Sequence, residues 1–119
     1  MCGGLCSSNQ PTNQKEFRMT DNARLHVVFL QRAKFDLGCL VATPNALNVL
    51  SHVDIVSGLS RHLRGDWGEL DREDHLSNES ALKHGGRLFS EYHSTRQVKF
   101  WIITECDRSA TTVLLPEDY

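Results

Sequence analysis

The sequence predicts an α+β fold in which a mainly antiparallel sheet of three to four strands, built from a C-terminal meander, packs against two or three helices. Three observations predict it. Apolar residues recur at a helical period of about 3.6 over 44–64, capping residues bound the segment 71–84, and the apolar period changes to two after residue 86. At 119 residues, the chain has the length of one domain.

The start of the chain is polar and lacks apolar periodicity. Residues 1–24 are rich in Gly, Ser, Asn and Gln, a composition that buries too little apolar surface to offset the entropy lost on ordering. We therefore expect a flexible tail over 1–24 and a single α+β domain over 25–119. Two runs with β-branched and aromatic residues, 25–30 and 35–42, are expected strands.

The segment 44–64 is the first expected helical region. Thr43 suits the N-cap, and Pro44 suits the first helical position because its missing N–H would have no partner there. A β-branched cluster weakens the centre, and Asp54 could cap a new start. The pattern therefore predicts either one bent helix or two helices that meet near 51–54, with Gly65 at the end.

A second helix is expected over 71–84, with Asp71 as its N-cap and Gly85 just past its last residue. Few of its residues are apolar, so it should cover one side of the fold rather than lie in the middle. The meander follows, with strands expected over 88–93, 98–105 and 110–115 and hairpin loops over 94–97 and 106–109.

The middle strand of the meander alternates two large apolar sets. Phe100 and Ile102 face one side, whereas Trp101 and Ile103 face the other. Such a strand is expected to lie inside the sheet and to be covered on both faces.

The charge of the chain bears on its partners. It carries 13 Lys+Arg against 15 Asp+Glu, a formal net charge of −2, divided into +2 over residues 1–44 and −4 over residues 45–119. This balance lacks the broad positive field on which non-specific nucleic-acid binding rests, so a protein partner is expected rather than a nucleic acid. No apolar run reaches the roughly 20 residues of a membrane helix, so no membrane partner is expected. The sequence does not specify an oligomeric state.

Cysteine and histidine spacing predicts neither a disulfide framework nor a metal site. Cys2, Cys6, Cys39 and Cys106 are unevenly spaced and follow no secretory segment, which favours a reducing cytoplasm. Cys2 and Cys6 lack the second close ligand pair that zinc needs, and the six histidines lie nine or more residues apart. No metal and no cofactor are expected.

Candidate site residues gather at two loops. They are His62, Asp66 and Trp67 where the first helical region ends, and Glu105, Asp107, Arg108 and Thr111 around the last hairpin. Loops beside rigid elements often carry binding residues, and an arginine can grip a phosphate or carboxylate through two donors. Capping, core packing and a solvated turn are the simpler explanations of the same residues. If a functional surface exists, Asp66 and Trp67 should lie near Glu105 or Arg108.

Several strings in residues 37–119 are long and specific. They are LG at 37–38, VATP at 41–44, RH at 61–62, GDWG at 65–68, WIITE at 101–105, DRS at 107–109 and TTVLLP at 111–116. On these strings the chain resembles a family of short bacterial proteins found on plasmids and integrated mobile elements, described as plasmid-related proteins. The resemblance implies a genomic setting and supplies no reaction.

Two functions follow as hypotheses. The first is a small non-enzymatic accessory protein of a bacterial mobile element that binds a macromolecular partner, in regulation or in countering host defence. The second is a small ribonuclease-type toxin enzyme resembling RelE, in which His, Arg and Tyr side chains would supply acid-base chemistry and stabilise phosphate. The net charge of −2 and the absence of a catalytic motif in the sequence favour the non-enzymatic hypothesis.

Overall fold

The computed structural model describes residues 33–119, so the expected tail over 1–24 and the expected strand over 25–30 lie outside the described residues. The described part is α+β. Its strands are β1 (Cys39–Ala42), β2 (Leu88–His93), β3 (Lys99–Thr104) and β4 (Ala110–Leu114), and its helices are α2 (Pro44–Val49), α3 (His52–Leu63), α4 (Arg72–His84) and the short 3-10 helix η1 (Pro116–Asp118).

The four strands form one mixed sheet in the order β1-β4-β3-β2. The C-terminal meander β2-β3-β4 is antiparallel, as predicted. The fourth strand lies outside the meander and makes the sheet mixed: β1, within the expected strand 35–42, precedes the three described helices and pairs in parallel with β4, with Leu40 opposite Thr111. The three helices and the first two meander strands lie between β1 and β4 in the chain, and such a long connection permits parallel pairing. β3 has a neighbour on each side, as the sequence predicts.

The region 44–64 forms two helices, one of the two alternatives that the sequence left open. Thr43 caps α2, where its hydroxyl accepts a hydrogen bond from the Ala46 N–H. Ser51 rather than Asp54 caps α3, where its hydroxyl accepts from the Asp54 N–H at 3.0 Å. Asp71 caps α4, as predicted.

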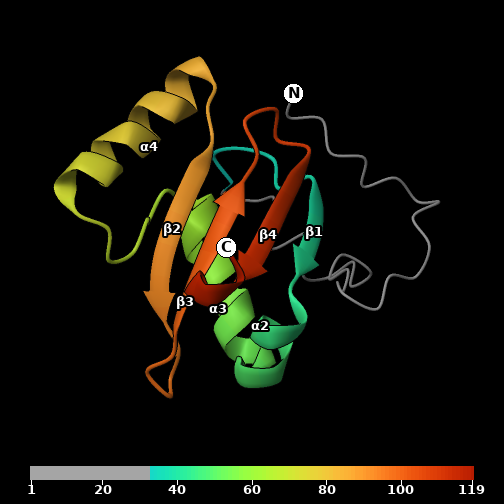
Figure 1. The fold of residues 1–119 in the computed structure, drawn as a ribbon. Coiled ribbons are helices and arrows are strands. Elements are labelled where there is room, and N and C mark those ends of the chain that lie inside the picture. Colours follow the sequence, from blue (N-terminus) through green and yellow to red (C-terminus); the bar gives the residue numbers. More distant parts are fainter. Residues whose placement is uncertain (1–32) are drawn as a thin grey trace.

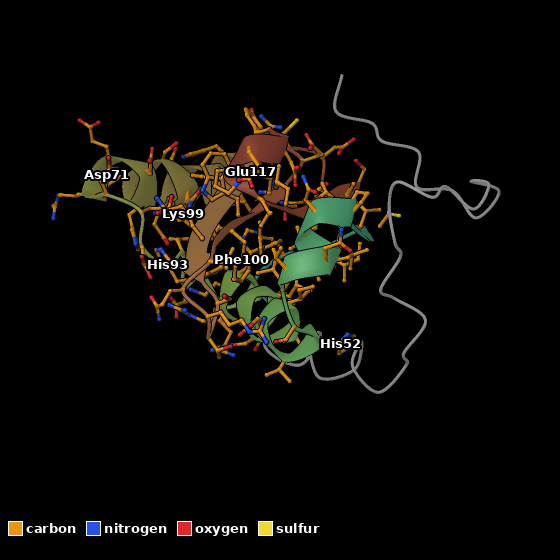
Figure 2. All side chains as sticks on the ribbon, turned by 60° about the horizontal axis from the view of Figure 1, so that its bottom comes forward. His52, Asp71, His93, Lys99, Phe100 and Glu117 are labelled. Carbon is orange, nitrogen blue, oxygen red and sulfur yellow. The ribbon has the colours of Figure 1, made fainter. Side chains whose placement is uncertain are left out.

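Helix α3 and η1 lie on opposite faces of the sheet, and α4 projects beside β2 (Figure 1). Figure 2 shows Phe100 on the face that α3 covers and Glu117 of η1 on the other. The main core lies on the α3 face, where Phe100 and Ile102 are fully buried. On the η1 face Ile103 is also buried, but Trp101 is only half-buried. The expectation that β3 is covered on both faces is therefore wrong at Trp101, because η1 is a single short turn.

The outer edge of β2 is closed without another full strand. The Asn78 side chain on α4 donates to the Phe89 carbonyl at 2.6 Å and accepts from the Phe89 N–H at 3.1 Å. Two residues further along β2, the Glu91 N–H donates to the Trp67 carbonyl. The Glu91 carbonyl oxygen lies so close to Gly68 that a Cβ built on this glycine would be 2.0 Å from that oxygen. A side-chain amide and a short loop thus occupy the backbone groups that an edge strand leaves open.

Between residues 33 and 119, none of the helices has both the length and the apolar character that crossing a membrane requires.

Candidate functional site

His62 is fully buried at the end of α3 and is part of a chain of buried hydrogen bonds. Its Nδ1 lies 2.5 Å from the Ser90 hydroxyl and its Nε2 lies 2.9 Å from the Thr104 hydroxyl. The Thr104 hydroxyl lies 2.7 Å from that of Thr111, which in turn donates to the Leu37 carbonyl. The chain joins α3 to three strands of the sheet.

The Leu37 end of this chain fixes the direction of its bonds as far as His62 Nε2. The Leu37 carbonyl can only accept a hydrogen bond, so the Thr111 hydroxyl donates its one hydrogen to it. Thr104 must therefore donate to Thr111, and His62 Nε2–H must donate to Thr104. Burial, with the charge of Arg108 as a second cause, lowers the pKa of His62 to about 3, so the ring is neutral near pH 7. A neutral ring with its proton on Nε2 accepts at Nδ1 from the Ser90 hydroxyl.

Phe35 brings three of the predicted site residues together. Its ring meets that of His62 edge-on at 5.2 Å, stacks on that of Trp67 at 6.4 Å, and lies under the Arg108 guanidinium at 5.7 Å. Trp67 is fully buried, and its indole N–H donates to Glu79 at 2.8 Å. His62, Trp67 and Thr111 thus belong to the interior, with no surface to offer a partner.

The Arg108 guanidinium is used by the fold. It donates to the carbonyls of Ala81 and Gly86, at the end of α4, and to those of Glu105 and Cys106 in its own turn. A cation near the last carbonyls of a helix is favourable. The donors that could grip a phosphate are therefore directed at backbone oxygens.

The remaining predicted site residues form local surface contacts. The Asp66 carboxylate accepts two hydrogen bonds from Arg61, at 2.8 and 3.2 Å, and the Arg61 hydrogen bond lowers the pKa of Asp66. Glu105 lies 3.7 Å from Arg87. Asp107 accepts from the Ser109 N–H within the last hairpin. The two predicted loops thus approach each other through Trp67, Phe35 and Arg108, while the Asp66 carboxylate is bonded within its own loop.

A groove of about 370 Å³ lies on the η1 face of the sheet. We call it the sheet-face groove. Its floor is apolar, and one wall comes from α4. Its lining residues are Asp74, Ser77, Asn78, Arg87, Phe89, Trp101, Ile103 and Tyr119.

Three aromatic rings shape the sheet-face groove. Phe89 and Trp101 lie on adjacent strands with ring centroids 5.0 Å apart and nearly perpendicular planes. The Tyr119 ring meets Trp101 edge-on at 5.9 Å, and 70% of Tyr119 is exposed. The Trp101 indole N–H donates to Glu91, which leaves the ring face as an apolar surface. The groove can therefore accept a large apolar or aromatic group.

The sequence predictions missed this groove. Large apolar residues occur at both odd and even positions of 88–93 and 98–105, a pattern that predicts a sheet covered on both faces. One signal in the sequence did point to an uncovered sheet face. The expected helix 71–84 has too few apolar residues to cover such a face. Within residues 33–119 no group of three or more His, Cys, Asp or Glu side chains could hold a metal ion.

No family model, curated protein or solved structure matches this chain.

Proposed function

We propose that the chain is a small non-enzymatic accessory protein of a bacterial mobile element, and that it binds a protein partner through the sheet-face groove, in regulation or in countering host defence. The mobile-element setting comes from the sequence resemblance. The single observation that carries the binding function is the groove itself, an apolar recess on a sheet face that no long helix of residues 33–119 covers.

The residue types of the groove support a protein partner. Trp, Tyr and Arg dominate the energetics of protein interfaces, and one of each, Trp101, Tyr119 and Arg87, stands in this lining. A rigid sheet holds Trp101, so little conformational entropy is lost on binding. Tyr119 stands exposed at the rim with its hydroxyl accepting from Arg87 at 3.0 Å.

His62 supports the binding function over a ribonuclease. General acid-base catalysis needs a side chain within reach of the substrate and with a pKa near the operating pH. His62 is buried, bonded at both ring nitrogens, and has a pKa lowered to about 3. Arg108, whose charge contributes to lowering that pKa, is directed at backbone carbonyls.

The test begins with a photo-crosslinking residue at Tyr119 in cells of the native host, with Val53 on α3 as the matched position on the other face of the sheet. A protein crosslinked from Tyr119 and not from Val53 is then purified, and its Kd is measured against the whole chain. Tyr119→Ala should weaken binding at least about tenfold, the scale of an interface hot spot. Leu76→Ala, an exposed apolar residue of α4 outside the groove lining, should leave the Kd unchanged.

Two results would contradict the proposal. One is a Tyr119→Ala variant that binds the purified partner as tightly as the original chain. The other is multiple-turnover cleavage of RNA by the purified chain that His62→Gln abolishes, which would favour the ribonuclease.

A further inference from the structure

The two charged residues that line the sheet-face groove differ in how their charge is used. Arg87 lies 3.7 Å from Glu105, donates to the Tyr119 hydroxyl, and has its guanidinium 5.7 Å from the Tyr119 ring. A cation with a carboxylate neighbour and a ring contact has little attraction left for an incoming anion. Arg87 is thus already engaged within the chain.

Asp74 has no such partner. Within residues 33–119, no side chain forms an ion pair or hydrogen bond with its carboxylate. Its backbone N–H is capped by Asp71, which places Asp74 in the first turn of α4, where the positive end of the helix favours a negative charge. Asp74 is therefore the charged residue of the groove lining that no side chain of residues 33–119 pairs with.

The lysine of β3 is engaged within the chain. Lys99 lies 3.6 Å from Glu91, and Glu91 also accepts from the Trp101 indole N–H. Over residues 45–119 the chain carries a formal charge of −4. Complementary charge steers and selects partners, so this groove favours a cationic group over an anionic one.

We infer that the sheet-face groove recognises a protein segment in which a large apolar or aromatic side chain stands close to a lysine or arginine. The apolar side chain packs on Trp101, Phe89 and Ile103, and the cation pairs with the Asp74 carboxylate at the α4 wall. A nucleic acid would bring phosphates toward the unpaired carboxylate and is disfavoured on the same ground. This inference rests on the proposed binding function and adds the chemistry of the partner.

The experiment selects peptides from a random library displayed on phage, with the full chain as bait. The selected peptides are then synthesised and titrated into the ¹⁵N-labelled chain. The two indole N–H signals report separately, because Trp101 lies in the groove whereas Trp67 is buried against Glu79. Peptides that shift the Trp101 signal and leave the Trp67 signal in place occupy the groove without unfolding the chain.

We expect the groove-binding peptides to be enriched in a large apolar residue beside Lys or Arg. Asp74→Asn should weaken their binding about three- to fivefold, the scale of one exposed ion pair, and should reduce its salt dependence. Glu73→Gln is the matched control, since it removes the same charge from the same turn at a residue that does not line the groove. Replacing the peptide cation with Gln should abolish the difference between the original chain and Asp74→Asn.

The outcomes distinguish a failure of the inferred partner chemistry from a failure of the proposed binding function. Peptides that shift Trp101 but are neutral or acidic, or that bind Asp74→Asn and Glu73→Gln equally, overturn the inference while the binding function stands. If no peptide shifts Trp101, the groove binds no protein segment and both fail. A single-stranded oligonucleotide that shifts Trp101 at lower concentration than any peptide overturns the choice of partner.

Discussion

Acidification below pH 6.5 should destabilise this protein through His62. In the folded chain, burial lowers the pKa of His62 to about 3, whereas an unfolded histidine titrates near its ordinary value of 6.5. Between these two values the unfolded chain binds a proton that the folded chain does not. Stability therefore falls as the pH falls from 6.5 toward 3.

The size of the effect follows from the same two values. Each pH unit inside the window costs about 1.4 kcal/mol, so His62 alone should remove about 2 kcal/mol between pH 6.5 and 4.5. Carboxyl groups whose pKa is lowered contribute stability that is lost only as the pH falls below their ordinary value of 3.8; Asp118, which accepts from Thr43 at 2.6 Å, is one of them. The window from 6.5 to 4.5 thus lies above the ordinary pKa of these aspartates, and comparison with a variant that lacks the imidazole isolates His62.

Urea denaturation of the original chain and of His62→Gln at pH 6.5, 5.5 and 4.5 measures this contribution. The glutamine amide can still donate to Thr104 and accept from Ser90, but it does not titrate. The original chain should lose about 2 kcal/mol more than the variant over this range. Should the variant fail to fold, the ring nitrogens of His62 can be titrated by NMR in the original chain. A ring that titrates near 6.5, or equal losses in the two proteins, would refute the reasoning.

Three further substitutions test the packing. Phe100→Ala should cost about 3–5 kcal/mol in urea denaturation, as for large buried aromatics, and a loss below about 1 kcal/mol would show that its ring is not in the core. Asn78→Ala should cost about 1–3 kcal/mol because it strands both backbone groups of Phe89, whereas Ser80→Ala on the exposed side of α4 should change little; equal losses would be evidence against the edge contact. Gly68→Ala should lower the Tm more than Gly85→Ala. Both glycines have φ above +80°, a conformation that costs about 1–3 kcal/mol for alanine. A Cβ at Gly68 would lie 2.0 Å from a backbone oxygen, whereas a Cβ at Gly85 would meet nothing within 4 Å. Indistinguishable Tm values for the two variants would contradict the close approach at Gly68.

Features that depend on near neighbours in the chain could be predicted from the sequence. Thr43 and Asp71 accept from N–H groups three residues away, so the starts of α2 and α4 follow from local chemistry. The meander follows from its period and its loop lengths, and its three strands lie where alternation predicts them, to within a residue at their ends. The split between α2 and α3 was also foreshadowed, although Ser51 rather than Asp54 caps the second helix.

Features that depend on distant segments could not be predicted. Nothing near β1 in the sequence specifies that Leu40 pairs with Thr111, some seventy residues later. His62, Arg108 and Thr111 have the residue types of a site, yet their partners are a serine 28 residues away, a helix end 27 residues away and a carbonyl 74 residues away. The groove was missed for the same reason, because Arg87, Trp101 and Tyr119 converge only once the sheet is formed.

The covered edge of β2 has a consequence for how this protein behaves in crowded solution. An open strand edge is a template on which a second chain can align and from which aggregates grow. Here the outward backbone groups of Phe89 are already bonded to Asn78, and those of Glu91 to the loop at 67–69. Transient detachment of α4 would expose the backbone N–H and carbonyl of Phe89 together with the apolar floor of the groove. By staying attached, the helix therefore protects the chain from aggregation. Variants that weaken the Asn78 contact should therefore accumulate as insoluble protein at temperatures where the remaining sheet is still folded.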